Sequence, residues 1–95
     1  MTVENLIAEY RKHNPDGHYF DRATLRFFGE RIDEMEIIPL AGNGIMIDRY
    51  GVTHEVWCLK SIAHNAPTGT GLHYTYFDKK TFEEVEPKWR DSLYE

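Results

Sequence analysis

The residues best suited to chemistry in this chain are five histidines and the carboxylates near them. His13, Asp16, His18 and Asp21 fall within nine residues, a density that suggests a metal site. Zinc sites, however, take converging ligands, commonly two histidines four apart on a helix or closely spaced cysteines. Neither pattern occurs. We therefore expect no metal and no other cofactor, with His13 at a helix end and His18 just before a helix cap.

Nucleophilic and acid–base chemistry have equally weak signals. His54, His64 and His73 lie in strand-like or loop-like segments, where half-buried packing histidines are more common than acid–base residues. Whether these three histidines converge depends on which strands are adjacent. Cys58 lies in the apolar run VWCL, whereas a reactive thiol needs exposure and a lowered pKa. We expect no catalytic residue and a protein that is not an enzyme.

A basic, aromatic stretch raises a nucleic-acid hypothesis. Arg22, Arg26 and Arg31 are interleaved with Phe27 and Phe28, and Arg22 and Arg26 lie one helical turn apart, where they could contact phosphates. Glu30 completes the same spacing of four residues. A helix face with Arg22, Arg26 and Glu30 at intervals of four favours solvated, ion-paired side chains, and a nucleic-acid-binding face remains the alternative.

The distribution of charge points to a different partner. The net charge is −5, and residues 1 to 32 are balanced, so the acidic excess lies in residues 33 to 95. An acidic surface repels phosphate and attracts basic protein surfaces, so nucleic acid is not the expected partner. The candidate protein-binding residues form two clusters: Asp33, Glu34 and Glu36, and Glu83, Glu84 and Glu86.

Two helices are expected in the N-terminal third. Apolar residues spaced by three and four predict a helix over residues 3 to 13, with Thr2 as its N-cap and a turn at residues 14 to 17. A second helix is expected over residues 22 to 28. Asp21 would cap its first amides, Gly29 would end it, and its apolar side would consist of Ala23, Phe27 and Phe28.

The chain after the second helix is expected to consist mainly of strands. Residues 45 to 50 and 72 to 77 are expected to form strands, residues 41 to 44 a turn, and residues 64 to 71 a long loop. Residues 53 to 62 form the expected central strand, with Trp57 and Leu59 on one face and Val56 and Cys58 on the other. The sequence therefore predicts one α+β domain over residues 1–95, with two short N-terminal helices packed on a three- or four-stranded antiparallel sheet.

One block resembles a known family. The run GHYFDRATLRFFG, residues 17 to 29, is similar to the signature of short, uncharacterised accessory proteins of tailed bacteriophages and prophages. That pattern is roughly Gly-His-aromatic-Phe-(Asp or Ser)-x-x-Thr-(Leu or Met)-Arg-Phe-Phe, followed by a strand-rich half. The block YFD at residues 76 to 78, with Thr81 and Phe82, resembles a feature of that half.

The resemblance implies a non-enzymatic factor that binds and modulates or inhibits a host protein, such as a defence or transcription component, in the host cytoplasm. No apolar run is long enough to cross a bilayer, so no membrane partner is expected. An exposed sheet edge can pair with a second copy, which leaves a homodimer open.

Overall fold

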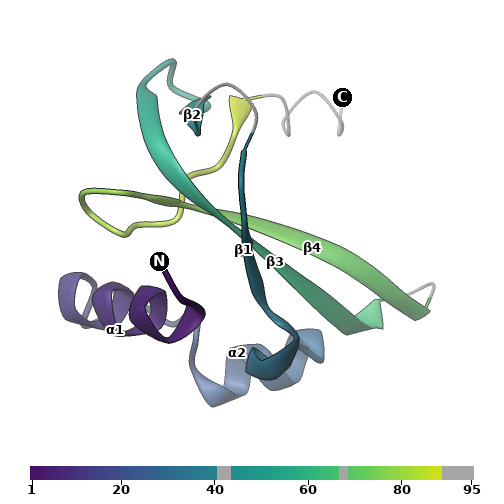
Figure 1. Cartoon of the computed structure of the whole chain (residues 1–95). Coiled ribbons are helices and arrows are strands. Elements are labelled where there is room, and N and C mark those ends of the chain that lie inside the picture. Colours follow the sequence, from purple (N-terminus) through teal and green to yellow (C-terminus); the bar gives the residue numbers. More distant parts are fainter. Residues whose placement is uncertain (41–43, 67–68, 89–95) are drawn as a thin grey trace.

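The computed structural model describes residues 1–40, 44–66 and 69–88, and its two helices and four strands form an α+β fold (Figure 1). This confirms the predicted fold class. The helices α1 (Val3–His13) and α2 (Arg22–Phe28) come first, followed by a 3-10 turn, η1 (Ile32–Glu34). The strands are β1 (Glu36–Ile38), β2 (Ile45–Ile47), β3 (Thr53–Ala66) and β4 (Gly69–Asp78).

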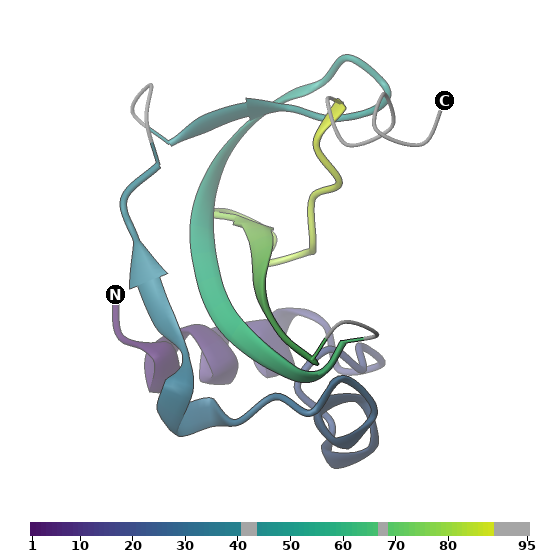
Figure 2. The same ribbon diagram turned by 90° about the vertical axis from the view of Figure 1, so that its right-hand side faces the viewer.

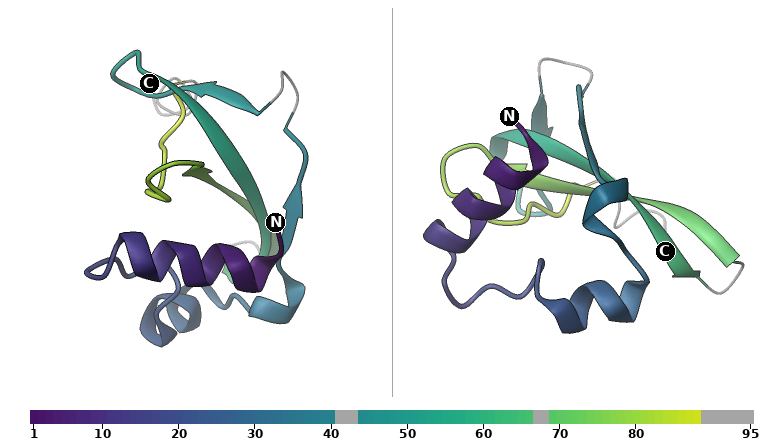
Figure 3. Two further views of the ribbon diagram at one scale, coloured as in Figure 1. Left: turned by 60° about the vertical axis from the view of Figure 1, so that its left-hand side comes forward. Right: turned by 60° about the horizontal axis from the view of Figure 1, so that its bottom comes forward.

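The long strand β3 organises the sheet, because it pairs antiparallel with each of the other three strands. Its first residues pair with β2, its middle with β1, and almost its whole length with β4. Figure 2 shows β3 curving strongly, with both helices below one end of the sheet. Figure 3 shows α1 running across the sheet and α2 beside the end of the sheet at which β3 leads into β4.

Both faces of the central strand are packed, as its alternation predicts. Leu59 and Phe77 are fully buried in a cluster with α1 residues, and Trp57 packs against the same cluster. Val56 and Cys58 lie in a second cluster on the opposite face. The prediction of two faces for residues 53 to 62 is confirmed, and Cys58 is a buried packing residue whose thiol pKa is raised by burial.

The helix predicted over residues 3 to 13 matches α1. The Thr2 hydroxyl accepts a hydrogen bond from the Asn5 amide (3.1 Å), as an N-cap should. The helix ends at Asn14, and Gly17 then passes so close to Tyr10 that a Cβ there would collide with the tyrosine hydroxyl. Part of the predicted turn at residues 41 to 44, namely 41–43, lies outside the described residues.

Three local predictions need correction. Asp21 is the N-cap position of α2, but its carboxylate accepts from His18 Nδ1 (2.7 Å) and caps no amide. The expected apolar packing side of α2, Ala23, Phe27 and Phe28, is exposed, because the helix turns Leu25 toward the core. The predicted loop at residues 64 to 71 is mostly strand: β3 and β4 extend into it as a long hairpin, and residues 67–68 lie outside the described part.

The expected strand over residues 45 to 50 is also shorter than predicted. β2 ends at Ile47, and Asp48 then accepts hydrogen bonds from the amides of Tyr50 and Val52 within a tight turn. None of the helices in the described part of the chain is both long and apolar enough to cross a membrane.

Candidate functional site

Helix α2 carries two exposed aromatic side chains next to two arginines. Phe27 is 74% exposed and Phe28 is 41% exposed, and their rings meet edge to face with centroids 5.0 Å apart. Arg22 and Arg26 lie on the same solvent-facing side, one turn apart, next to the row formed by Ala23 and Phe27. We call the exposed side chains of Arg22, Arg26, Phe27 and Phe28 the α2 surface.

The arginines of the α2 surface are not paired as the sequence suggested. Glu30 completes the spacing of four in sequence, but α2 ends at Phe28 and Gly29 takes a left-handed conformation (φ 65°), which turns Glu30 into the interior. Within the described ranges, neither Arg22 nor Arg26 has an ion-pair partner, while Arg31 lies 4.0 Å from Glu34. The charge of Arg22 and Arg26 is therefore available to a ligand.

A pocket opens beside the α2 surface. Its volume is about 560 Å³, and its lining is mostly apolar: Phe27, Phe28, Ala63, Asn65, Gly71, Leu72 and His73. Leu72, on β4, is 59% exposed. Exposed aromatic and aliphatic side chains gathered around a hollow are typical of a surface that binds a partner or ligand.

The pocket has a fixed shape because α2 is tied to the end of β3. Asn65 Nδ2 donates to the carbonyl oxygens of Arg26 (3.1 Å) and Phe27 (3.2 Å), and so satisfies the last carbonyl groups of the helix. The His64 amide donates to the Gly29 carbonyl (3.2 Å). A Cβ on Gly29 would lie 2.9 Å from the Asn65 backbone nitrogen, so this close approach requires glycine.

A polar network lies beneath the pocket. The Glu30 side chain is only 1% exposed, and its Oε1 accepts from Ser61 Oγ (2.8 Å) and from His73 Nδ1 (2.6 Å). Nearby, the hydroxyls of Tyr19 and Thr75 are 2.6 Å apart, and burial raises the pKa of Tyr19. Within this network, the bond to Glu30 ties the His73 ring to the buried carboxylate at the edge of the pocket.

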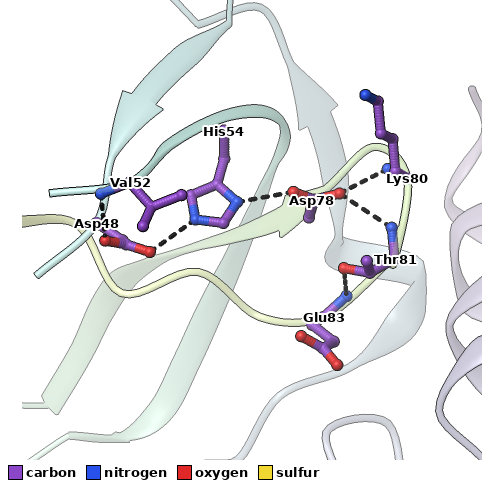
Figure 4. Close-up of polar contacts among 7 residues, drawn as sticks. All are labelled: Asp48, Val52, His54, Asp78, Lys80, Thr81 and Glu83. Carbon is purple, nitrogen blue, oxygen red and sulfur yellow. Dashed lines mark hydrogen bonds and ion pairs between the residues drawn. The ribbon is translucent and has the colours of Figure 1, made fainter. Parts of the chain in front are cut away.

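A second polar centre surrounds His54, at the opposite end of β3. Its Nδ1 donates to Asp78 (2.7 Å) and its Nε2 to Asp48 (2.7 Å), so the ring bridges two carboxylates (Figure 4). The other oxygen of Asp78 accepts from the amides of Lys80 and Thr81. We call Asp48, His54 and Asp78 the His54 clamp.

The His54 clamp is built to hold charge. The hydrogen bonds to Asp78 and Asp48 raise the pKa of His54, against the opposing effect of burial. The bond from His54, with the amides of Val52 and Tyr50, lowers the pKa of Asp48. Burial would raise the pKa of Asp78, but bonds from His54 and the Thr81 and Lys80 amides outweigh it and lower that pKa. When both ring nitrogens donate to these carboxylates, the histidine has no lone pair for base catalysis, and the ring joins Asp48 to Asp78.

The two acidic clusters lie on opposite edges of the sheet. Asp33, Glu34 and Glu36 lead into and begin β1, which pairs with β3, while Glu84 bridges Phe77 on β4. Strands β3 and β4 therefore separate the clusters, which do not form one continuous acidic face. Glu34 is also engaged by His64 Nε2 (2.8 Å). Glu83, Glu84 and Glu86 line a pocket of about 300 Å³ beside the His54 clamp.

The histidines are dispersed. His54, His64 and His73 bind different carboxylates, and His13, the last residue of α1, stacks on Phe82 (centroids 5.1 Å apart). In the portion of the chain that the structure describes, no three His, Cys, Asp or Glu side chains converge to form a metal site.

The sequence indicates the arginines and the interleaved Phe27 and Phe28, but not the exposure of the two rings. Its spacing predicts Phe27 and Phe28 on the apolar side of the helix, and the apolar side of an amphipathic helix usually faces a core. The contacts of Glu30 with His73, and of Asn65 with α2, join residues 43 and 39 positions apart and leave no local pattern.

Comparison with known proteins gives one informative similarity. Over 89 residues, 94% of this chain, the sequence is 26% identical to a protein of Mycobacterium ulcerans (strain Agy99) named oligoribonuclease. The chain spans 37% of the length of that relative. No family model and no solved structure matches the chain.

This similarity corrects the first functional prediction. A non-enzymatic factor that modulates a host protein through an acidic face conflicts with a relative whose name refers to RNA. The alternative, a nucleic-acid-associated protein using the face of Arg22, Arg26 and Arg31, agrees better with it. The acidic excess favoured the wrong surface, because the net charge of a chain does not describe a small surface whose local charge differs from the average.

Proposed function

We propose that this chain binds short single-stranded nucleic acid, with RNA as the ligand class, through the α2 surface. The observation that carries the proposal is the pair of exposed, perpendicular phenylalanines beside two arginines that have no ion-pair partner in the described residues. The surrounding apolar pocket extends this surface onto β3 and β4.

The chemistry of the α2 surface suits a single strand. Unstacked bases present flat apolar faces, and stacking one of them on an aromatic side chain contributes about 1–3 kcal/mol. Guanidinium groups bind phosphate oxygens and also stack on bases. A duplex hides its base faces, so Phe27 and Phe28 would have little to contact there.

RNA is favoured over DNA by the comparison. The relative that aligns over 94% of this chain bears a name that refers to ribonucleotide oligomers, and the chain covers 37% of that protein. We carry over the ligand class suggested by this name, and the proposal concerns binding. Short ligands also fit the size of a surface formed by one helix of seven residues and the end of a hairpin.

The test is binding of a fluorescent RNA pentamer, followed by anisotropy at low salt. The double variant Arg22→Gln and Arg26→Gln should weaken binding about tenfold or more. It should also reduce the dependence of log K on log salt by about 1.4, because each phosphate contact to a single strand contributes about 0.7.

The matched control removes the same charge elsewhere. Arg11 and Lys12 are exposed in the last turn of α1, and the double variant Arg11→Gln and Lys12→Gln should bind with nearly unchanged affinity. Equal losses in the two double variants would mean that net charge, and not the α2 surface, governs binding. No binding by the wild type at millimolar protein would reject the proposal.

A further inference from the structure

We propose that the pocket beside α2 receives one unstacked nucleobase, and that His73 Nε2 accepts a hydrogen bond from an N–H group on the edge of that base. This inference rests on the proposed function and adds a recognition site to it. His73 would be a specificity-determining residue, and Glu30 a positioning residue that acts through it.

The tautomer of His73 follows from its partner. An ionised carboxylate has only acceptor sites, so the contact between His73 Nδ1 and Glu30 Oε1 (2.6 Å) requires the proton on Nδ1. In the neutral ring Nε2 then carries the lone pair. Among the residues described, the His73 ring makes its one polar contact through Nδ1, and the side chain is 33% exposed, so Nε2 is accessible to a ligand.

The walls around Nε2 suit a flat ring. The centroids of the Phe28 and His73 rings lie 5.9 Å apart, their planes are inclined by 34°, and both residues line the pocket. Phe27 and Leu72 supply further exposed apolar surface around the pocket. A nucleobase combines an apolar face with polar groups on its edge, which matches apolar walls with one fixed acceptor.

A phosphate would be a poor occupant of this pocket. None of the described residues that line it is a lysine or an arginine. The buried Glu30 carboxylate lies directly behind His73 and would repel an anion. When the ring is neutral and carries its proton on Nδ1, Nε2 offers a lone pair, which calls for a donor such as a base N–H. The phosphates of the same strand are left to Arg22 and Arg26 on the outer side of α2.

The experiment is ¹⁵N NMR of the histidine rings in the full, wild-type chain, alone and with two RNA probes. One probe is a cytidine pentamer, whose bases carry amino donors. The other is the same ribose-phosphate strand with all bases removed. The free protein should show His73 protonated on Nδ1. The cytidine pentamer should shift the Nε2 signal as that atom accepts a hydrogen bond, and the abasic strand should not.

Two variants separate recognition from folding. Glu30→Gln replaces the carboxylate with an amide that can donate to Nδ1, so His73 is no longer restricted to the tautomer with its proton on Nδ1. It should move the proton toward Nε2 and weaken cytidine binding about fivefold, the value of one ordinary hydrogen bond. Ser61→Ala removes the other donor to the Glu30 carboxylate and should leave the tautomer of His73 unchanged.

Contrary results are distinct. A free wild-type protein with His73 protonated on Nε2 would overturn the inference. An Nε2 signal that moves equally with the abasic strand would also overturn it, because the contact would then be with ribose or phosphate. If anisotropy detects pentamer binding that depends on Arg22 and Arg26 while the Nε2 signal stays still, the proposed function holds and this inference fails. Loss of all RNA binding would reject both.

Discussion

At the scale of single residues, Gly29 decides whether the α2 surface exists. It ends α2 in a left-handed conformation and lies against the Asn65 backbone, so it serves both the helix end and the docking of that helix on β3. The sequence predicts the first role, because glycine after a short helix is a recognised stop signal. It is silent on the second, which depends on a residue 36 positions further along the chain.

A matched pair of glycines separates these two roles. Gly51 has a similar positive φ (81°), but a Cβ there would meet nothing within 4 Å. Gly51→Ala should therefore cost only the backbone penalty of about 1–2 kcal/mol. Gly29→Ala adds the contact with the Asn65 nitrogen at 2.9 Å, so its loss of unfolding free energy in urea should be larger by about 1 kcal/mol or more. Equal losses would show that α2 is not closely docked on β3.

At the scale of elements, the His54 clamp joins the turn after β2, the start of β3 and the end of β4. The sequence placed these strands, but not the clamp, since its three residues come from three segments and only folding brings them together. The long hairpin was missed for a related reason. Asn65 and Gly71 are typical of loops, yet β3 and β4 pair through this region, so tertiary pairing overrides local preference.

The clamp predicts a particular dependence of stability on pH. His54 has a raised pKa, so its contribution is complete below the ordinary imidazole value of about 6.5 and is lost as pH rises through the raised value. Asp48 and Asp78 have lowered pKa values, so their contribution is complete above about 4 and is lost as pH falls further. The clamp should stabilise the fold most between about pH 4 and 6.5.

The measurement compares the wild type with His54→Gln in urea unfolding across this range. The difference in unfolding free energy should be greatest near pH 5 to 6 and should shrink on both sides. His64→Gln serves as the control, because His64 is an exposed histidine with a single glutamate partner. A difference for His54→Gln that stays constant from pH 4 to 9 would contradict a charged clamp.

At the scale of the whole molecule, the acidic clusters and the α2 surface are separated in space. The net charge is −5, and the acidic clusters lie at opposite edges of the sheet. Two arginines without an ion pair in the described residues and two exposed phenylalanines gather on α2. The sequence was sufficient for the fold class and for naming the arginine face as an alternative. It ranked the acidic clusters above the arginine face, because the exposure of Phe27 and the burial of Glu30 depend on packing that the sequence does not show.

We propose that nucleic acid binds at the α2 surface, and NMR mapping of the labelled protein with a single-stranded RNA pentamer tests this binding site most directly. Backbone shifts should concentrate in α2 and in residues 63 to 65 and 69 to 73, and should weaken in the variant Phe27→Ala. Residues 83 to 86, on the other edge of the sheet, should stay unchanged. Shifts confined to residues 83 to 86, or an absence of shifts at millimolar RNA, would contradict the account.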